Sequence, residues 1–150
     1  IKEKSKFLPI TDASMTRFWI TIDEGINLVH KAFINMIGGE IFVPKIPSIK
    51  IIDLAKAMAP NLQQKIIGIR PGEKIHEVLF SSDESHQVLE FKKYYLLTPT
   101  VRSFGKKIKN YIKDVSGEKG KFIKNRFEYS SKNTNHLSIK DLKKFIDEIN

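Results

Sequence analysis

Apolar residues recur at spacings of three and four in three stretches of the chain. This period matches one face of an α-helix. It predicts helices over residues 22–36 and 50–59, and a third helix that opens at residue 139. The three apolar faces consist of Ile22, Ile26, Val29 and Phe33; of Ile51, Leu54, Ala55 and Met58; and of Leu142, Phe145, Ile146 and Ile149.

Polar residues next to the first and third apolar faces indicate where these helices begin. Thr21 and Glu24 have the spacing of a capping box, in which two residues bond each other's backbone N–H groups through their side chains. Ser138 and Asp141 have the same spacing at the third helix. A Gly-Gly pair at 38–39 favours the end of the first helix, because glycine readily takes the left-handed conformation found there.

Short segments rich in β-branched and aromatic residues predict strands between the helices. These segments are the second half of residues 10–20, and residues 40–44, 65–69 and 94–98. An amphipathic segment over residues 73–80 predicts a further short helix, and residues 100–137 predict an irregular extension because their periodicity is weak. The alternation of strands and helices favours an α/β fold.

Composition narrows the class of protein. A chain of 150 residues with 41% hydrophobic and 29% charged residues is typical of one globular domain. No apolar run reaches the length that crosses a bilayer. The absence of cysteine excludes disulfides and cysteine-ligated metals, and it agrees with a reducing cytoplasm. The chain starts at Ile1 in a Lys-rich stretch, from which we expect a segment of a longer protein.

The formal net charge of +9 raises the possibility of nucleic-acid binding. Residues 1–100 hold 13 Lys and Arg against 11 Asp and Glu, whereas residues 101–150 hold 13 against 6. The excess therefore lies in the last third, which is rich in Lys. A Lys-rich segment is usually a solvated surface. A basic nucleic-acid-binding module over residues 100–132 remains the alternative.

Three charged residues stand beside apolar segments and are candidates for a ligand site. Arg17 lies among large apolar neighbours, where a guanidinium needs an anionic partner or water, so both a structural ion pair and an anionic ligand stay open. Arg70 and Glu73 flank a Pro-Gly turn. Arg70 has donors suited to phosphate or carboxylate, and Glu73 has acceptors suited to hydroxyls. A weak surface ion pair in this turn is the competing interpretation.

The sequence around these residues resembles that of a known family. The stretches concerned are Pro9-Ile10-Thr11-Asp12, Met15-Thr16-Arg17-Phe18-Trp19-Ile20, Gly38-Gly39-Glu40-Ile41-Phe42-Val43-Pro44-Lys45, Asp53-Leu54-Ala55 and Ile69-Arg70-Pro71-Gly72-Glu73-Lys74-Ile75-His76-Glu77. Together they closely resemble the C-terminal part of inverting UDP-N-acetylglucosamine 4,6-dehydratases. These are extended short-chain dehydrogenase/reductase enzymes of bacterial polysaccharide and flagellin-sugar biosynthesis, of the pseudaminic acid type. The resemblance resumes at residues 127–131 and leaves residues 100–126 unmatched.

The resemblance implies a fold and an organisation. The fold would be the α/β substrate-binding C-terminal part of a Rossmann-type short-chain dehydrogenase/reductase, with a small mixed sheet and flanking helices. Residues 1–99 would form the substrate-binding portion and residues 100–126 an irregular Lys-rich extension. Residues 127–150 would form a strand or loop and an amphipathic helix.

The resemblance also implies roles for the three candidates. Arg17 and Arg70 would contact the diphosphate of a UDP-sugar, and Glu73 would accept bonds from the ribose hydroxyls. The chain lacks a Gly-x-Gly-x-x-Gly turn and a Tyr-x-x-x-Lys pair, so NADP and the catalytic residues are expected in a missing N-terminal half. For this reason no catalytic residue or cofactor contact is assigned in this chain. No metal ligand is assigned either, because His76-Glu77 lacks the second His of a zinc-protease signature.

The whole enzyme, by resemblance, oxidises C4 of the sugar with NADP, eliminates water across C5–C6, and returns the hydride to C6 with inversion at C5. A UDP-sugar 4-epimerase of the same superfamily is the alternative, since it would use the same nucleotide contacts. The expected partners are the UDP-sugar and further copies of the full-length enzyme, and neither nucleic acid nor a membrane. The expected location is the cytoplasm, and the fragment alone is expected to be inactive.

Overall fold

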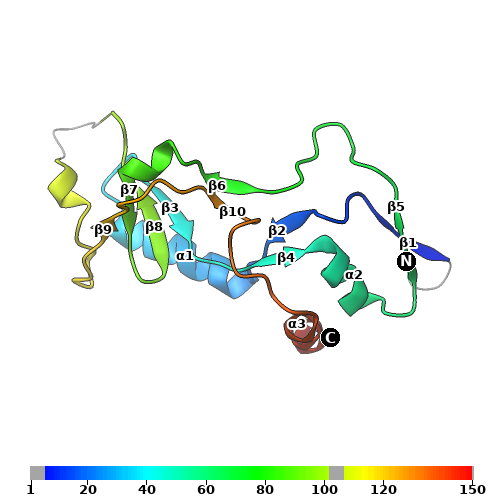
Figure 1. Ribbon diagram of the computed structural model, residues 1–150. Helices are drawn as coiled ribbons and strands as arrows, with labels where there is room; N and C mark the ends of the chain where they lie inside the picture. The colour runs from blue at the N-terminus through cyan, green and yellow to red at the C-terminus, as the bar shows by residue number, and fades with distance from the viewer. Residues whose placement is uncertain (1–5, 102–106, 150) are drawn as a thin grey trace. The chain divides into compact units, whose positions relative to one another are not determined.

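The computed structural model describes residues 6–101 and 107–149, and it has a mixed α/β fold (Figure 1). The described residues group into two compact units. The first unit contains residues 6–19, 47–77 and 130–149, and the second contains residues 20–46, 78–101 and 107–129. Each unit is therefore built from stretches that are distant in the sequence. The predicted α/β class is confirmed, with parallel and antiparallel strands in small sheets beside three helices.

The first unit combines two strand pairs with two helices. Strand β1 (Phe7–Ile10) pairs in parallel with β5 (Gln63–Ile66), and β2 (Thr16–Phe18) pairs antiparallel with β4 (Ser48–Lys50). Helix α2 (Ile51–Met58) follows β4 directly. The core of this unit forms where α2 meets helix α3 (Ile139–Ile149). Its buried members are Ile49, Ala57 and Leu142, with Trp19, Ile51, Leu54, Leu137, Ile139 and Ile146 packed against them.

Helix α3 begins where the sequence predicted. The N–H of Ser138 donates to Asp141 Oδ2 at 3.0 Å, and the N–H of Asp141 donates to Ser138 Oγ at 3.2 Å, which confirms the capping box. Leu142 is fully buried, as expected of the apolar face. The side chain of Ile149, also assigned to that face, lies outside the described residues.

The second unit is organised around an antiparallel sheet in the order β3-β8-β7-β9. These strands are β3 (Ile41–Pro44), β7 (Val88–Glu90), β8 (Tyr94–Leu97) and β9 (Lys121–Phe122). Its core contains Leu89, Phe91, Tyr94, Leu96 and Tyr111. The described part of this unit also contains the 3₁₀ turns Glu84–Gln87 and Ile108–Asn110. The predicted strands at 40–44 and 94–98 are confirmed as β3 and β8.

Helix α1 (Ile22–Asn35) of the second unit confirms the predicted first helix and its cap. Thr21 Oγ1 accepts from the Glu24 N–H, and Glu24 Oε2 accepts from the Thr21 N–H. The predicted apolar face is present, but its four residues are between 60% and 82% exposed. The spacing thus identified the helix, although no residue of α1 is buried in the structure of the described residues.

The segment between residues 65 and 80 differs from the prediction. The strand expected at 65–69 is shifted to β5, and the helix expected at 73–80 is wrong. Residues 67–77 form an extended loop, and strand β6 (Val78–Phe80) follows. Strand β6 pairs with β10 (Tyr129–Ser130). The weak periodicity of residues 100–137 does not predict this strand, whereas the family resemblance predicts a strand or loop after residue 127. The apolar residues at 78–80 therefore serve a strand, because a partner strand is available about fifty residues later.

A buried ion pair in the second unit leads to a stability prediction. Asp114 is buried, and its carboxylate accepts from Lys31 Nζ and Ser116 Oγ at 2.6 Å each and from the Glu118 N–H at 3.0 Å. Burial by itself raises the pKa of the Asp114 carboxyl, but these hydrogen bonds outweigh it and place the pKa below its ordinary value.

Replacing Asp114 with asparagine is expected to lower the free energy of unfolding by about 1–3 kcal/mol at neutral pH, because charge-assisted hydrogen bonds are lost. A lowered pKa in the folded state stabilises the protein above the unfolded pKa of about 3.9, and this stability is lost as the pH falls through the folded pKa. Urea unfolding between pH 7 and pH 3 measures both effects. Asp83→Asn is the control. The side chain of Asp83 is 90% exposed, and its ion pair with Arg126 is a long one of 3.7 Å, so its loss should cost little. Equal stability losses in the two variants would contradict the prediction.

Candidate functional site

Strand β2 of the first unit carries Arg17, one of the predicted substrate contacts. In the β2–β4 pair, Arg17 lies opposite Ile49. Its Nη1 donates to the carbonyl of Thr16 at 2.7 Å and to the carbonyl of Ile75 at 3.2 Å. Its Nε lies 3.6 Å from Glu77 Oε1. Of the two possibilities that the sequence left open for Arg17, a structural ion pair is therefore present, and an anionic ligand remains a prediction.

The Arg70–Glu73 turn is closed by its own residues. The N–H of Glu73 donates to the carbonyl of Arg70, and the N–H of Arg70 donates to Glu73 Oε2, each at 3.1 Å. Gly72 has φ +82°, a left-handed conformation that glycine adopts without steric cost. Arg70 is exposed. Glu73 uses one carboxylate oxygen to hold the turn, while Oε1 remains for a further donor. The competing surface ion pair between Arg70 and Glu73 is absent from the contacts of these described residues.

Backbone contacts place the loop after this turn directly against β2. The N–H of Thr16 donates to the carbonyl of Ile75 at 2.9 Å. The same carbonyl accepts from Arg17 Nη1. The structure thus brings the strand that carries Arg17 and the loop that carries Arg70 and Glu73 together in one unit. Contact of these three residues with a substrate stays a prediction.

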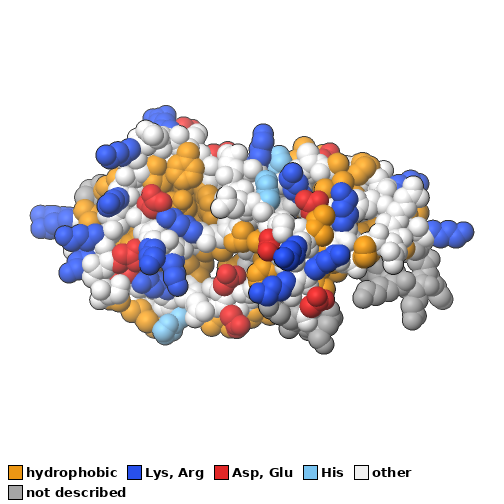
Figure 2. All heavy atoms as spheres, turned by 60° about the horizontal axis from the view of Figure 1, so that its bottom comes forward, with side chains coloured by type: hydrophobic (Ala, Val, Ile, Leu, Met, Phe, Trp, Pro, Cys, Tyr) orange, Lys and Arg blue, Asp and Glu red, His pale blue; other side chains and the backbone are white. Residues whose placement is uncertain are grey.

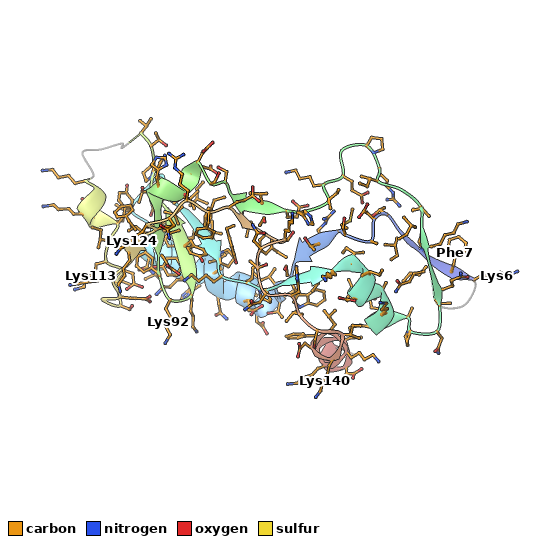
Figure 3. The ribbon with its side chains drawn as sticks, in the orientation of Figure 1. Lys6, Phe7, Lys92, Lys113, Lys124 and Lys140 are labelled. Carbon is orange, nitrogen blue, oxygen red and sulfur yellow. The ribbon has the colours of Figure 1, made fainter. Side chains whose placement is uncertain are left out.

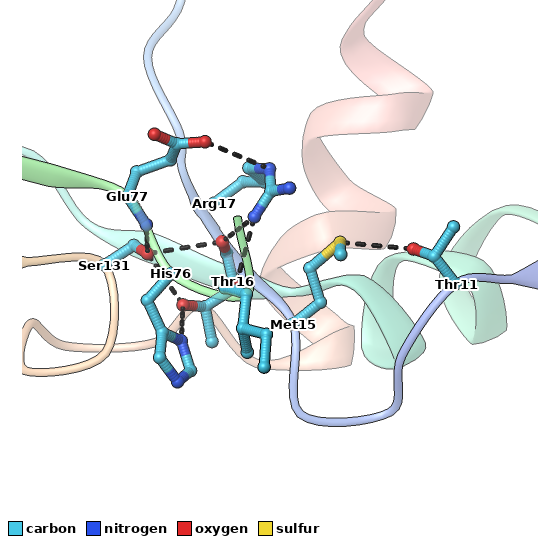
Figure 4. A network of polar contacts seen from close by, with 8 residues as sticks. Thr11, Met15, Thr16, Arg17, His76, Glu77 and Ser131 are labelled. Atoms are coloured by element: carbon cyan, nitrogen blue, oxygen red, sulfur yellow. Dashed lines mark hydrogen bonds and ion pairs between the residues drawn. The ribbon is translucent and has the colours of Figure 1, made fainter. Parts of the chain in front are cut away.

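A buried polar cluster next to Arg17 was not predicted from the sequence (Figure 4). Thr16 and Ser131 are buried, and their hydroxyl oxygens lie 2.7 Å apart. Thr16 Oγ1 also lies 2.8 Å from Nδ1 of His76. Ser131 belongs to the stretch 127–131 where the family wording resumes, which is the one sequence signal that pointed to it. Its partner Thr16 could not be identified because 115 positions separate the two residues.

The described residues do not fit the dinucleotide cofactor that the family resemblance implies. Such a cofactor needs a glycine-rich turn at a helix N-terminus, where free N–H groups bind its pyrophosphate. The first turns of α1, α2 and α3 instead contain Asp23 with Glu24, Asp53, and Asp141. These carboxylates would repel a pyrophosphate. Within residues 6–101 and 107–149, no group of three or more His, Asp or Glu is arranged to hold a metal ion.

Several lysines in and near the basic segment of the second unit are exposed. Lys92 and Lys113 extend away from the ribbon, and Lys124 is exposed too (Figure 3). On the face in Figure 2, Lys and Arg side chains lie among acidic and hydrophobic ones. The predicted solvated surface and the alternative nucleic-acid module both remain predictions, and residues 102–106 of that module lie outside the described part. Among the described residues, no helix combines the length and the apolar character needed to cross a membrane.

Comparisons with known proteins agree with the family resemblance. Residues 1–99 match the family model of polysaccharide biosynthesis proteins. The chain is 53% identical over 133 residues to an inverting UDP-N-acetylglucosamine 4,6-dehydratase of Campylobacter jejuni subsp. jejuni serotype O:2, covering 89% of this chain and 40% of that protein. It is 35% identical over 153 residues to a UDP-glucose 4-epimerase of Rickettsia canadensis, covering 99% of this chain and 43% of that protein.

A solved structure extends the similarity to the fold. The X-ray structure of Pen from Bacillus thuringiensis superposes with a TM-score of 0.76 at 27% sequence identity. The similarity covers 98% of this chain and 41% of Pen. The chain thus spans about two fifths of the length of the proteins that it matches.

Proposed function

Given that this chain belongs to the polysaccharide biosynthesis protein family, we propose that it is the UDP-sugar-binding part of an inverting UDP-N-acetylglucosamine 4,6-dehydratase. The identity of 53% to such a dehydratase, against 35% to a 4-epimerase, favours the dehydratase over the alternative. Residues 1–99 would supply the substrate-binding portion. The longer protein would act in the cytoplasm as a homo-oligomer.

One structural observation carries the assignment of the site. Arg17 Nη1 bonds the carbonyl of Ile75, which lies in the loop that begins at the Arg70–Glu73 turn. Two arginines on elements joined in this way are suited to a diphosphate, because each guanidinium forms planar, charge-assisted bonds to phosphate oxygens. Oε1 of Glu73 would accept from a ribose hydroxyl. The task of this chain is therefore to bind and orient the nucleotide part of the substrate.

The chemical steps would be carried out by the part of the protein that is outside this chain. The family implies a nicotinamide cofactor, and we propose NADP, which accepts and returns a hydride when bound. Because the helix N-termini of the described residues are acidic, the other part of the protein would hold it. This division predicts that the isolated chain binds UDP but does not convert UDP-N-acetylglucosamine.

The test is binding of UDP-N-acetylglucosamine to the full-length protein and to its Arg70→Ala variant. The ligand is expected to raise the melting temperature of the wild type, since a ligand that binds only the folded state stabilises it. Loss of a charge-assisted bond of about 1.5–3 kcal/mol should weaken binding about 10- to 150-fold. Titration of each protein with the ligand by calorimetry measures this change.

Arg126→Ala is the matched control, because Arg126 is an exposed arginine of the second unit and 73% of its side chain is accessible. It should bind like the wild type. Equal affinity of the Arg70→Ala variant and the wild type would refute the assignment of the site. Mass spectrometry of the product separates the two activities, since dehydration removes one water from the UDP-sugar and epimerisation leaves its mass unchanged.

A further inference from the structure

The side chain of Arg17 is held from three directions, and the groups that hold it come from the loop and from its own strand (Figure 4). The carbonyls of Thr16 and Ile75 fix Nη1, and the carboxylate of Glu77 faces Nε. The dashed lines from Arg17 in Figure 4 end on Nη1 and Nε, and among the residues drawn none ends on Nη2. The guanidinium of Arg17 is therefore held in one orientation by Nη1 and Nε, and among the residues drawn the two N–H donors of Nη2 do not take part in holding it.

Ser131 connects the same elements. It is fully buried, and its Oγ accepts from the Glu77 N–H at 2.9 Å and donates to the Thr16 carbonyl at 3.2 Å. Its N–H donates to the Glu77 carbonyl at 2.8 Å. The Thr16 carbonyl is also the group that holds Arg17 Nη1. One buried hydroxyl thus joins the strand that carries Arg17 to the backbone of Glu77, the ion-pair partner of Arg17.

The exposure of the ion pair indicates what it contributes. The side chains of Arg17 and Glu77 are 26% and 40% exposed, and the Nε–Oε1 distance is 3.6 Å. Ion pairs of this exposure contribute little to stability, because water screens them. Their effect on geometry is larger. A guanidinium that is already oriented loses less side-chain entropy when it binds a phosphate than a free one does.

We propose that Glu77 and Ser131 are positioning residues that orient Arg17 toward the diphosphate of the substrate and hold its strand against the Arg70 loop. This proposal rests on the proposed function, since it presumes that Arg17 contacts the diphosphate. It assigns the C-terminal stretch that begins at Ser130 a part in the ligand site. Neither residue is expected to touch the substrate.

The experiment measures the affinity of the full-length protein for UDP by calorimetry in a double-mutant cycle of Arg17→Ala and Glu77→Gln. Glu77→Gln is expected to weaken binding about 2- to 10-fold, the change that corresponds to ordering one flexible side chain on binding. In the Arg17→Ala background the same substitution should change the affinity by less than about 2-fold, because Glu77 acts through Arg17. A purely structural role of Glu77 would not produce this coupling.

Matched variants complete the design. Glu90→Gln removes a carboxylate paired with Lys45, with side chains 50% and 24% exposed, and it should leave the affinity unchanged. Ser131→Ala should weaken UDP binding in the wild-type background and less in the Arg17→Ala background, at a temperature where melting curves show each variant folded. Unchanged affinity in Glu77→Gln, or equal losses in both backgrounds, would overturn the proposal while wild-type binding of UDP still stands. Absence of UDP binding to the wild type would instead overturn the proposed function.

Discussion

Phe80→Ala is expected to lower the free energy of unfolding of the second unit by about 3–5 kcal/mol, the range for deleting a buried phenylalanine ring. Phe80 is 1% exposed. Its ring centroid lies 5.3 Å from those of Tyr95 and Phe127, both in edge-to-face geometry, and 5.5 Å from that of Tyr129. Removal of the ring leaves three aromatic partners around a cavity and ends these favourable contacts.

Urea unfolding followed by circular dichroism measures this loss, and hydrogen exchange of β8 locates it within the second unit. Leu79→Ala is the matched control, because Leu79 is the preceding residue of the same strand and is 38% exposed. It should cost about 1 kcal/mol or less. Similar losses in the two variants would show that Phe80 is not at the centre of this cluster.

Local signals along the chain were sufficient for the helices. The capping boxes at Thr21 and Ser138 each involve residues three positions apart, so the sequence displays both partners of each bond. The apolar face around Leu142 likewise has helical spacing. The helices α1 and α3 were predicted correctly because both partners of each cap and the apolar spacing are visible within a few residues.

The Phe80 cluster shows why the rest was not predictable. Residues 73–80 have an amphipathic pattern that also suits a helix, and nothing nearby excludes one. The strand is favoured by Phe127 and Tyr129, which pack on Phe80 from a stretch that had no recognisable period. Pairing of β6 with β10 is a contact between distant residues, and tertiary context of this kind overrides local preference.

The candidate site also contains residues that the sequence identified and residues that only the fold revealed. Arg17, Arg70 and Glu73 were found from their residue types and from the family wording around them. Glu77 stands in one of the stretches that carry the family resemblance and in the rejected zinc signature, but no role in the ligand site was assigned to it. Its ion pair with Arg17 depends on β2 and the loop lying side by side, and 60 positions separate the two residues. The residues expected to bind were thus visible in the sequence, whereas those that hold them in place required the fold.

Arg17→Ala combined with Arg70→Ala is expected to have the largest effect on binding. If both arginines contact one diphosphate, each single variant loses about 1.5–3 kcal/mol and the double variant about 3–6 kcal/mol. The affinity for UDP should then fall about 10²- to 10⁴-fold in the double variant. Calorimetry with UDP and with uridine separates the contribution of the diphosphate. Uridine lacks the phosphates, so it should bind the wild type, both single variants and the double variant alike.

The double variant Arg17→Lys with Arg70→Lys is the charge-preserving comparison. It should recover only part of the affinity, since lysine cannot form a bidentate contact with phosphate oxygens. A double variant that binds UDP as well as the weaker of the two single variants would show that only one arginine reaches the diphosphate, and it would leave the other with a structural role.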